Sequence, residues 1–295
     1  ERVRQQFLVS VRDEAKDPGT MASRQWLAMA APGHAYGRNP HGTEATIQAM
    51  TTDDLRATHQ RLFTRKGLLI SVVGDMDAAT LARTLDDVFG ALPDTDPPAP
   101  PALLTVPEGP MLKVTDMDMP QSIILFGGAG LLRSDKDFIP AYVMNQILGG
   151  GLGSRLSSVV REKKGLTYGI DTGLLPLRRG GLFFGSFSTR NDKAGEAMAL
   201  VKQELQRMAK DGPTAEELEQ ARTYLTGSYA LRFDSNAKIA GQLLAIQQDN
   251  LGIDYINRRN ALVEAVTIAQ VKEQAQRLLH ADKLLVSVVG KPQGL

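Results

Sequence analysis

One stretch of this sequence gathers most of the residue types that could do chemistry. The segment Gly149–Ile170 reads GGGLGSRLSSVVREKKGLTYGI: a run of glycines, a short helix over 154–163, a break at Gly165 and then a strand. Its Arg161 guanidinium and Tyr168 phenol are hydrogen-bond donors suited to carbonyl oxygens or a carboxylate. Because Gly165 ends the helix, we expect Tyr168 to open the next strand and both side chains to converge on one concave site.

Two other interpretations of this segment stay open from the residues alone. A glycine loop before a helix N-terminus can hold a phosphate, but no Lys-Ser or Lys-Thr pair follows these glycines, and their spacing does not match the dinucleotide-binding fingerprint. The glycines can instead form a loop with positive φ that leads into the helix. In that case Arg161 makes a surface ion pair and Tyr168 fills the sheet.

The composition excludes several other kinds of site. The 295 residues include no Cys, which excludes disulfides, thiolate zinc sites and cysteine nucleophiles. No two of the four histidines, at 34, 41, 59 and 280, are four residues apart, so no two-histidine helical metal motif exists. The net charge of +1 does not favour a nucleic-acid partner. No apolar run reaches the roughly 18 residues that a membrane span needs.

Prolines divide the chain into two blocks. Seven of the 15 prolines lie in the segment 93–110, PDTDPPAPPALLTVPEGP. Because proline fixes φ and lacks a backbone donor, we expect an extended linker there. The linker separates a first block, 1–92, from a second block, 111–295.

An internal repeat relates the two blocks. The sequence LLISVVG at 68–74 returns as LLVSVVG at 284–290, 216 positions later. We interpret the repeat as a helix, over 51–64 and 267–279, followed by a strand of β-branched residues that stops at glycine. By the same offset the first unit lacks about a hundred residues before Glu1. We therefore expect the back part of one α+β unit, truncated at its N-terminus, and a complete second copy.

Within 111–295 the apolar pattern predicts a sheet covered by helices. Apolar and aromatic runs predict strands at 122–126 and 182–187. Helical spacing predicts helices at 137–148, 193–210, 214–231, 235–249 and 253–264, the third of them opened by a capping box of Thr214 and Glu217. Since strands and helices do not alternate strictly, we expect an α+β fold with helices on one face of an antiparallel-rich sheet.

The glycine-rich segment resembles the zinc-metallopeptidase family of pitrilysin, insulin-degrading enzyme and mitochondrial processing peptidase, the inverzincins. Members carry a glycine turn, then S-R-L, then R-E-x-x-G-L-x-Y; here the last two read SRL at 154–156 and REKKGLTY at 161–168. In the family, this Arg and Tyr belong to the C-terminal unit and complete an active site whose zinc lies in the N-terminal unit. The resemblance therefore implies catalytic and peptide-binding roles for Arg161 and Tyr168. A phenol suits this role because it can donate to a developing oxyanion.

Other basic residues extend this candidate site. Three arginines are candidates for the wall of a substrate chamber, where they would attract the acidic groups of a peptide: Arg155 of the SRL triplet, Arg178 and Arg179. The alternative is that these three arginines form a solvated surface. The resemblance also makes His34 and His41 loop residues rather than metal ligands.

The zinc site of the family is missing from this sequence. The motif H-x-x-E-H is absent and would lie before Glu1. The family's third zinc ligand is a Glu on the opening helix, and this sequence has Ser10 at that position. A second Glu that supports the site in the family is replaced here by Val3. A neutral hydroxyl is a poor zinc ligand beside a carboxylate. A shift of the ligand role to Glu14 would need an insertion.

The resemblance implies the Arg–Tyr subunit of a two-chain zinc endopeptidase. A homologous partner subunit, in a heterodimer or homodimer, would hold the zinc, and the chains would enclose a chamber for unfolded peptides. This chain would bind no metal itself, and whether it counts as an enzyme depends on the partner. Three alternatives are a self-sufficient peptidase whose metal segment is missing, a structural or assembly subunit like the family's respiratory-complex core proteins, and a nucleotide-binding protein. Bacterial relatives suggest a periplasmic location.

Overall fold

A single mixed sheet organises the fold. The computed structural model describes residues 1–295 and contains five strands: β1 (Met111–Thr115), β2 (Gln121–Ala129), β3 (Ile170–Leu177), β4 (Gly180–Arg190) and β5 (Leu285–Val289). Their order is β1-β5-β2-β4-β3, with β1 and β5 parallel and the other neighbours antiparallel. The two strands predicted from apolar runs are confirmed and are longer, because β2 continues through its glycines to pair with the start of β4.

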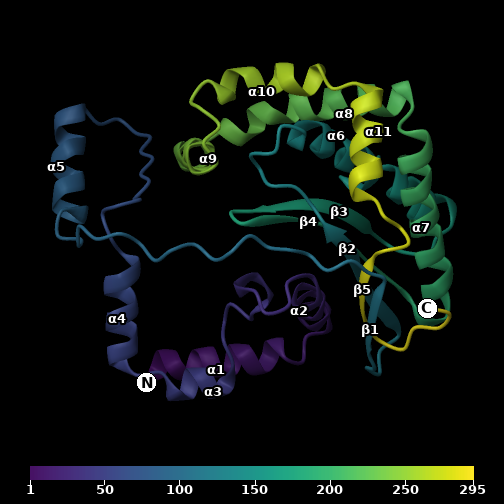
Figure 1. Cartoon of the computed structure of the whole chain (residues 1–295), viewed down its shortest axis with the longest axis horizontal. Coiled ribbons are helices and arrows are strands. Elements are labelled where there is room, and N and C mark those ends of the chain that lie inside the picture. Colours follow the sequence, from purple (N-terminus) through teal and green to yellow (C-terminus); the bar gives the residue numbers. More distant parts are fainter.

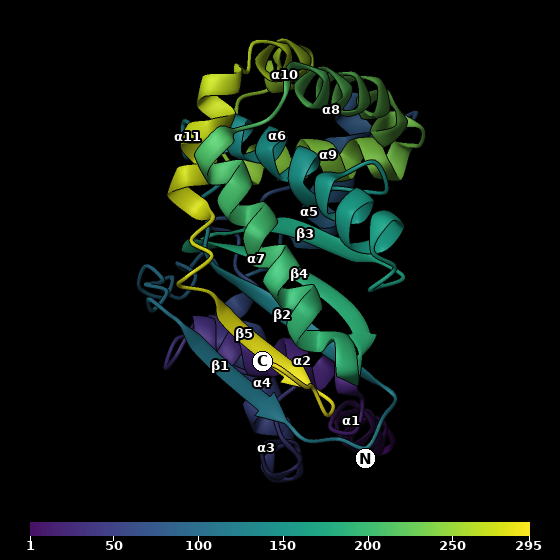
Figure 2. The ribbon, with the colours of Figure 1, turned by 90° about the vertical axis from the view of Figure 1, so that its right-hand side faces the viewer.

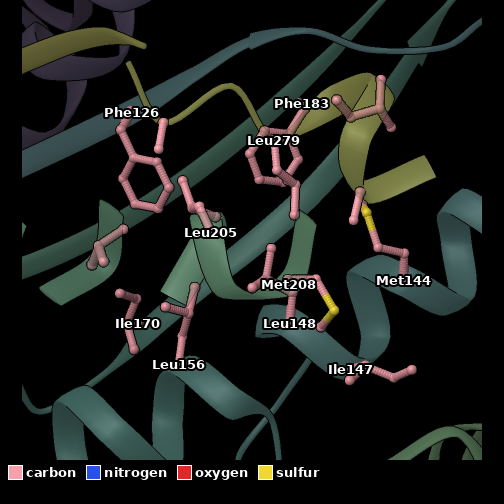
Figure 3. Close-up of a cluster of buried hydrophobic side chains, with 14 of the residues drawn as sticks. Phe126, Met144, Ile147, Leu148, Leu156, Ile170, Phe183, Leu205, Met208 and Leu279 are labelled. Carbon is pink, nitrogen blue, oxygen red and sulfur yellow. The ribbon is translucent and has the colours of Figure 1, made fainter. Parts of the chain in front are cut away.

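Helices of the second block cover one face of this sheet. They are α6 (Phe138–Gly149), α7 (Ala194–Asp211) and α11 (Ile268–Leu278), with α8 (Ala215–Gly227), α9 (Asn236–Gln248) and α10 (Tyr255–Glu264) packed further out. Figure 3 shows part of their shared core, which includes Phe126 and Phe183 of the sheet, Met144 of α6 and Leu205 of α7. The predicted α+β character and the Thr214 capping box are confirmed. The helix expected to run to 231 ends at Gly227 and continues as a 3-10 turn over Ser228–Phe233.

The opposite face of the sheet is also covered, which corrects the expectation of helices on one face only. Helix α2 (Pro18–Ala30), from the first block, lies behind the strands in Figure 2, with α7 in front of them. Its Trp26 is buried and donates from Nε1 to the Leu285 carbonyl oxygen at 2.9 Å. Ser287 Oγ donates to the Ala22 carbonyl oxygen, also at 2.9 Å. Residues of the first block therefore share a core with the strands of the second.

The remaining helices of the first block bury little. Helices α1 (Arg2–Glu14) and α3 (Glu44–Ala49) share a small cluster of Leu8, Val11 and Ile47. Helices α4 (Thr52–Leu62) and α5 (Ala78–Phe89) have no buried residues and stand apart from the sheet in Figure 1. The strand expected at 68–74 is wrong: this segment is irregular because no other strand lies beside it to share backbone hydrogen bonds.

The proline-rich segment 93–110 contains no helix or strand and runs from α5 to β1 as an extended chain (Figure 1). It is tied to the turn between β3 and β4, where Leu104 N donates to the Arg179 carbonyl oxygen at 2.7 Å. The Arg179 side chain in turn donates to the Pro101 carbonyl oxygen at 3.0 Å. Arg179 therefore anchors the linker rather than forming a free chamber wall. None of the helices combines the length and apolar character needed to cross a membrane.

Candidate functional site

The helix that carries Arg161 is wound more widely than an α-helix. Ser157–Lys163 is π-helical, a geometry that is frequent at functional sites. Leu156 and Val160 are fully buried and hold this turn against the core. Gly165 ends it in the left-handed conformation, with φ +61°, as the sequence predicts.

Tyr168 lies in the loop that follows, and its neighbours direct it outward. Leu166 is buried, and its carbonyl oxygen accepts from Thr189 Oγ1 at 2.6 Å. Thr167 Oγ1 donates to the Gly169 carbonyl oxygen at 2.7 Å, which forms a local turn. The Tyr168 side chain is 89% exposed. It does not fill the sheet, and it does not open β3, because this turn delays strand pairing until Ile170.

A hollow of about 490 Å³ lies beside Tyr168. It is bounded by the first turns of α2, the adjoining face of β2 and β4, and the start of β3. Its lining includes Ser23, Gln121, Ile123, Tyr168, Asp171, Phe184, Ser186 and Ser188. The sheet face that lines it is mixed: Ile123 and Leu125 are apolar, and their register partners Ser188 and Ser186 place hydroxyls on the same face. Such a surface suits an extended peptide, because its apolar groups can contact substrate side chains while its hydroxyls hydrogen-bond with the substrate backbone.

Arg161 is not part of the lining of this hollow. Its side chain is half-buried and makes no ion pair or side-chain hydrogen bond within the chain, so the guanidinium has no partner in this chain. The surface ion pair considered as its alternative role is absent. The convergence of Arg161 with Tyr168 on one cavity stays a prediction.

Arg155 has a structural role, which corrects its proposed place on a chamber wall or a solvated surface. The side chain is buried, and its Nε and Nη2 atoms donate to the two carboxylate oxygens of Glu217 at 2.9 and 2.7 Å. Nη2 also donates to the Gly212 carbonyl oxygen at 3.2 Å. Burial alone would raise the pKa of Glu217, but the hydrogen bonds from Arg155 and Thr214 hold it below its usual value. Arg155 therefore fixes the start of α8 to the arginine-bearing helix.

The residues at the expected zinc-ligand position do not fit a zinc ion. Ser10 is exposed, and its hydroxyl donates to Glu14 Oε1 at 3.3 Å. Glu14 is itself engaged, because His41 Nδ1 lies 2.8 Å from the same oxygen and Arg24 pairs with the other. The hydrogen bonds with His41 and Arg24 hold the pKa of Glu14 below its usual value. No three His, Cys, Asp or Glu side chains gather into a group that could hold a metal ion.

The fold and this site together define a metallopeptidase-like protein. The chain belongs to the peptidase M16 inactive domain family, whose model matches residues 49–225. It is 28% identical over 233 residues to an uncharacterized zinc protease of Streptomyces coelicolor, covering 77% of this chain and 51% of that protein. It is also 28% identical over 192 residues to the non-peptidase homolog YmxG of Helicobacter pylori, covering 65% of this chain and 44% of that protein.

A solved structure agrees with the fold along almost the whole chain. The peptidase M16 inactive domain from Pseudomonas fluorescens is 30% identical, with a TM-score of 0.91, and the match covers 99% of this chain and 70% of that one. The chain spans 51% and 44% of the lengths of the Streptomyces and Helicobacter proteins.

Proposed function

We propose that this chain is the Arg–Tyr subunit of a two-chain endopeptidase. It binds an extended, unfolded peptide, and a homologous subunit that carries the H-x-x-E-H motif holds the zinc. The observation that carries the proposal is the position of Tyr168, which ends the motif REKKGLTY. Its phenol is exposed and lies beside a hollow that suits an extended peptide.

Tyr168 and Arg161 act as hydrogen-bond donors to the substrate. The Tyr168 phenol donates to a peptide carbonyl oxygen, and this bond strengthens as negative charge develops on that oxygen. The Arg161 guanidinium, which has no partner in this chain, donates to neighbouring carbonyls or to a carboxylate of the peptide. A zinc ion in the partner would supply the polarised carbonyl and the activated water.

The hollow beside Tyr168 positions the peptide chain. Ile123 and Phe184 offer apolar contacts for substrate side chains, while Ser186 and Ser188 offer hydroxyls for its backbone groups. Helix α2 closes one side of the hollow through Ser23 and is itself fixed to the sheet by Trp26. This rigid frame favours one extended conformation of the peptide, which lowers the entropic cost of binding.

A reconstitution experiment tests the requirement for two chains. This chain, a zinc-bearing homologous subunit and an equimolar mixture are each assayed on a fluorogenic unfolded peptide, with size-exclusion chromatography to detect the complex. We expect cleavage from the mixture and little from either chain alone. Arg161→Ala should lower the cleavage rate of the mixture about tenfold or more without dissociating the complex. Equal cleavage by the partner alone would contradict the proposal.

A structural or assembly role is the second candidate. It is favoured by the relative described as a non-peptidase homolog, which shares 28% identity with this chain. In that case the complex forms, but neither Arg161→Ala nor Tyr168→Phe changes its peptide cleavage. A self-sufficient peptidase is the third candidate, and Ser10 at the ligand position argues against it. We retain the periplasmic location as part of the main proposal, to be tested by cell fractionation.

A further inference from the structure

A second cavity lies on the helical side of the edge strand β3. It has a volume of about 480 Å³ and is lined by residues of α6, β3, the 3-10 turn after α8, α9 and α10. We call it the three-arginine pocket, after Arg133, Arg232 and Arg259; three tyrosines, Tyr142, Tyr229 and Tyr255, also line it. None of its lining residues belongs to the hollow beside Tyr168.

Aromatic rings position two of the arginines. The Arg259 guanidinium lies over the Tyr229 ring, 4.6 Å from its centroid. The Arg133 guanidinium lies 4.4 Å from the Phe138 centroid and 5.2 Å from the Tyr255 centroid. Arg133 Nη2 also donates to the Tyr255 hydroxyl at 2.6 Å. Stacking on a ring fixes the plane of a guanidinium and leaves N–H groups at its edge available to a ligand.

The positive charge of the pocket is poorly balanced. Asp249 is the one acidic residue in the lining, and its Oδ2 lies 3.9 Å from Arg133 Nε. Arg232 and Arg259 make no ion pair and donate only to uncharged acceptors: Arg259 Nη1 donates to the Leu225 carbonyl oxygen at 2.6 Å, and Arg232 Nη2 donates to the Tyr142 hydroxyl at 3.3 Å. The other N–H groups of both guanidiniums stay available to a ligand. On the same helix as Arg259, by contrast, Arg258 is paired with Asp254 at 2.9 Å. Three cations facing one carboxylate in a partly buried cavity repel one another unless an anion joins them.

Two buried polar atoms in the lining also lack a partner. The Tyr229 hydroxyl is buried without a hydrogen bond, in a side chain that is 7% exposed. Burial raises the pKa of Tyr229, so the phenol remains protonated and able to donate at neutral pH. Asn145 Oδ1 is likewise buried and unpaired, while its Nδ2 donates to the Thr172 carbonyl oxygen at 3.1 Å. Unpaired buried polar atoms are rare in proteins and indicate a missing partner.

We propose that the three-arginine pocket binds a small organic molecule that carries an oxyanion group, either a carboxylate or a phosphate. The oxyanion accepts hydrogen bonds from the arginines and from Tyr229, and the body of the ligand packs on the tyrosine rings. A hydroxyl or amine of the ligand donates to Asn145 Oδ1. The volume supports an organic ligand, because small-molecule sites span about 300 to 1,000 Å³ and an inorganic ion would leave most of this cavity empty.

Three probes with the same ring test the proposal by calorimetric titration of the whole chain. Phenyl phosphate and benzoate carry the two oxyanions, and benzyl alcohol is the neutral control. We expect at least one anion to bind about tenfold or more tightly than benzyl alcohol, which also identifies the preferred oxyanion. If benzyl alcohol binds as tightly as both anions, or if neither anion binds at millimolar concentration, the proposal is wrong.

Two matched variants locate the binding. Arg232 lies at the exposed rim of the pocket, so Arg232→Gln removes a charge without disturbing the core. It should weaken binding of the preferred anion about tenfold. Lys238→Gln, which removes an exposed charge on α9 that is paired with Asp234 and lies outside the lining, should leave the affinity within about twofold of the wild type. Equal effects of the two substitutions would show attraction by general surface charge and would overturn the proposed site.

Discussion

The segments 68–74 and 284–290 differ at one of seven positions, yet one is irregular and the other is a central strand. In β5 every residue is buried, with β1 on one side and β2 on the other. In the first segment Leu68, Leu69 and Val72 are exposed. The two sequences have nearly the same local preference, so the difference comes from the neighbouring strands that supply hydrogen bonds and packing.

The helices that precede these segments show the opposite behaviour. Both α4 and α11 form, and both begin with a threonine capping box, at Thr51 and at Thr267. Helix α11 buries Val271, Ala275 and Leu278, whereas α4 buries nothing. A helix satisfies its backbone groups within its own segment, and a strand cannot. Local sequence signals therefore suffice for the repeated helix and not for the repeated strand.

A reciprocal arrangement supports the duplication as our interpretation. Helix α2 of the first block packs on β5 of the second, through Trp26 and Ala30. Leu243 of α9 stands 216 positions after Leu27 of α2, and α9 lines a cavity together with residues 70–72. Helix α2 of the first block thus lies against β5, and the corresponding helix α9 of the second block lies beside the segment 68–74.

The largest effect should come from removing the side chain that joins α2 to β5. Trp26→Ala deletes a buried ring and its hydrogen bond to the Leu285 carbonyl, and should lower the free energy of unfolding by about 3 to 5 kcal/mol. Trp26→Phe keeps an aromatic ring and should cost about 1 to 2 kcal/mol. Urea unfolding followed by far-ultraviolet circular dichroism measures both. A loss below about 0.5 kcal/mol for Trp26→Ala would show that α2 is dispensable to the sheet.

A matched pair of substitutions tests the contrast between the repeated segments directly. Leu285→Ala removes a fully buried side chain and should cost about 2 to 5 kcal/mol. Leu69→Ala, at the equivalent position 216 residues earlier, removes a side chain that is 41% exposed and should change stability by less than about 0.5 kcal/mol. Equal losses in the same urea titrations would mean that both segments pack in solution.

A smaller effect should come from the partly buried ion pair of Arg155 and Glu217 in the second block. Glu217→Gln removes the carboxylate that accepts both Arg155 hydrogen bonds and should cost about 1 to 3 kcal/mol at pH 7. Because folding lowers the pKa of Glu217, its contribution is fully present above the unfolded value near 4.5 and is lost as the pH falls through the lower folded value. The stability difference between wild type and variant should therefore shrink on acidification below pH 4.5. A difference independent of pH would exclude the ion pair as its source.

The sequence predicted the parts of the fold that depend on local patterns. Capping at Thr214, the helix stop at Gly165 and the apolar strand β2 were all readable from neighbouring residues. The packing of α2 on the second block was not, because Trp26 meets residues more than 250 positions away.

The candidate site was predictable as a motif and not as a geometry. The motif singled out Tyr168, but its outward direction depends on Leu166 and Thr167 contacts that spacing does not reveal. Arg155 was misassigned because its partner Glu217 lies 62 residues later, although the capping box did place Glu217 at a helix start. The three-arginine pocket was missed because its arginines come from three separate parts of the chain and form no motif.

The most direct test of the account is the turnover number of the two-chain mixture with Tyr168→Phe. Tyr224→Phe is the matched control, because Tyr224 is an exposed tyrosine, 58% accessible, on α8 and outside the hollow. We predict that Tyr168→Phe lowers kcat on an unfolded peptide about 100-fold or more with KM nearly unchanged, while Tyr224→Phe has no effect. A kcat for Tyr168→Phe equal to that of the control would contradict the assignment of Tyr168 to the reaction.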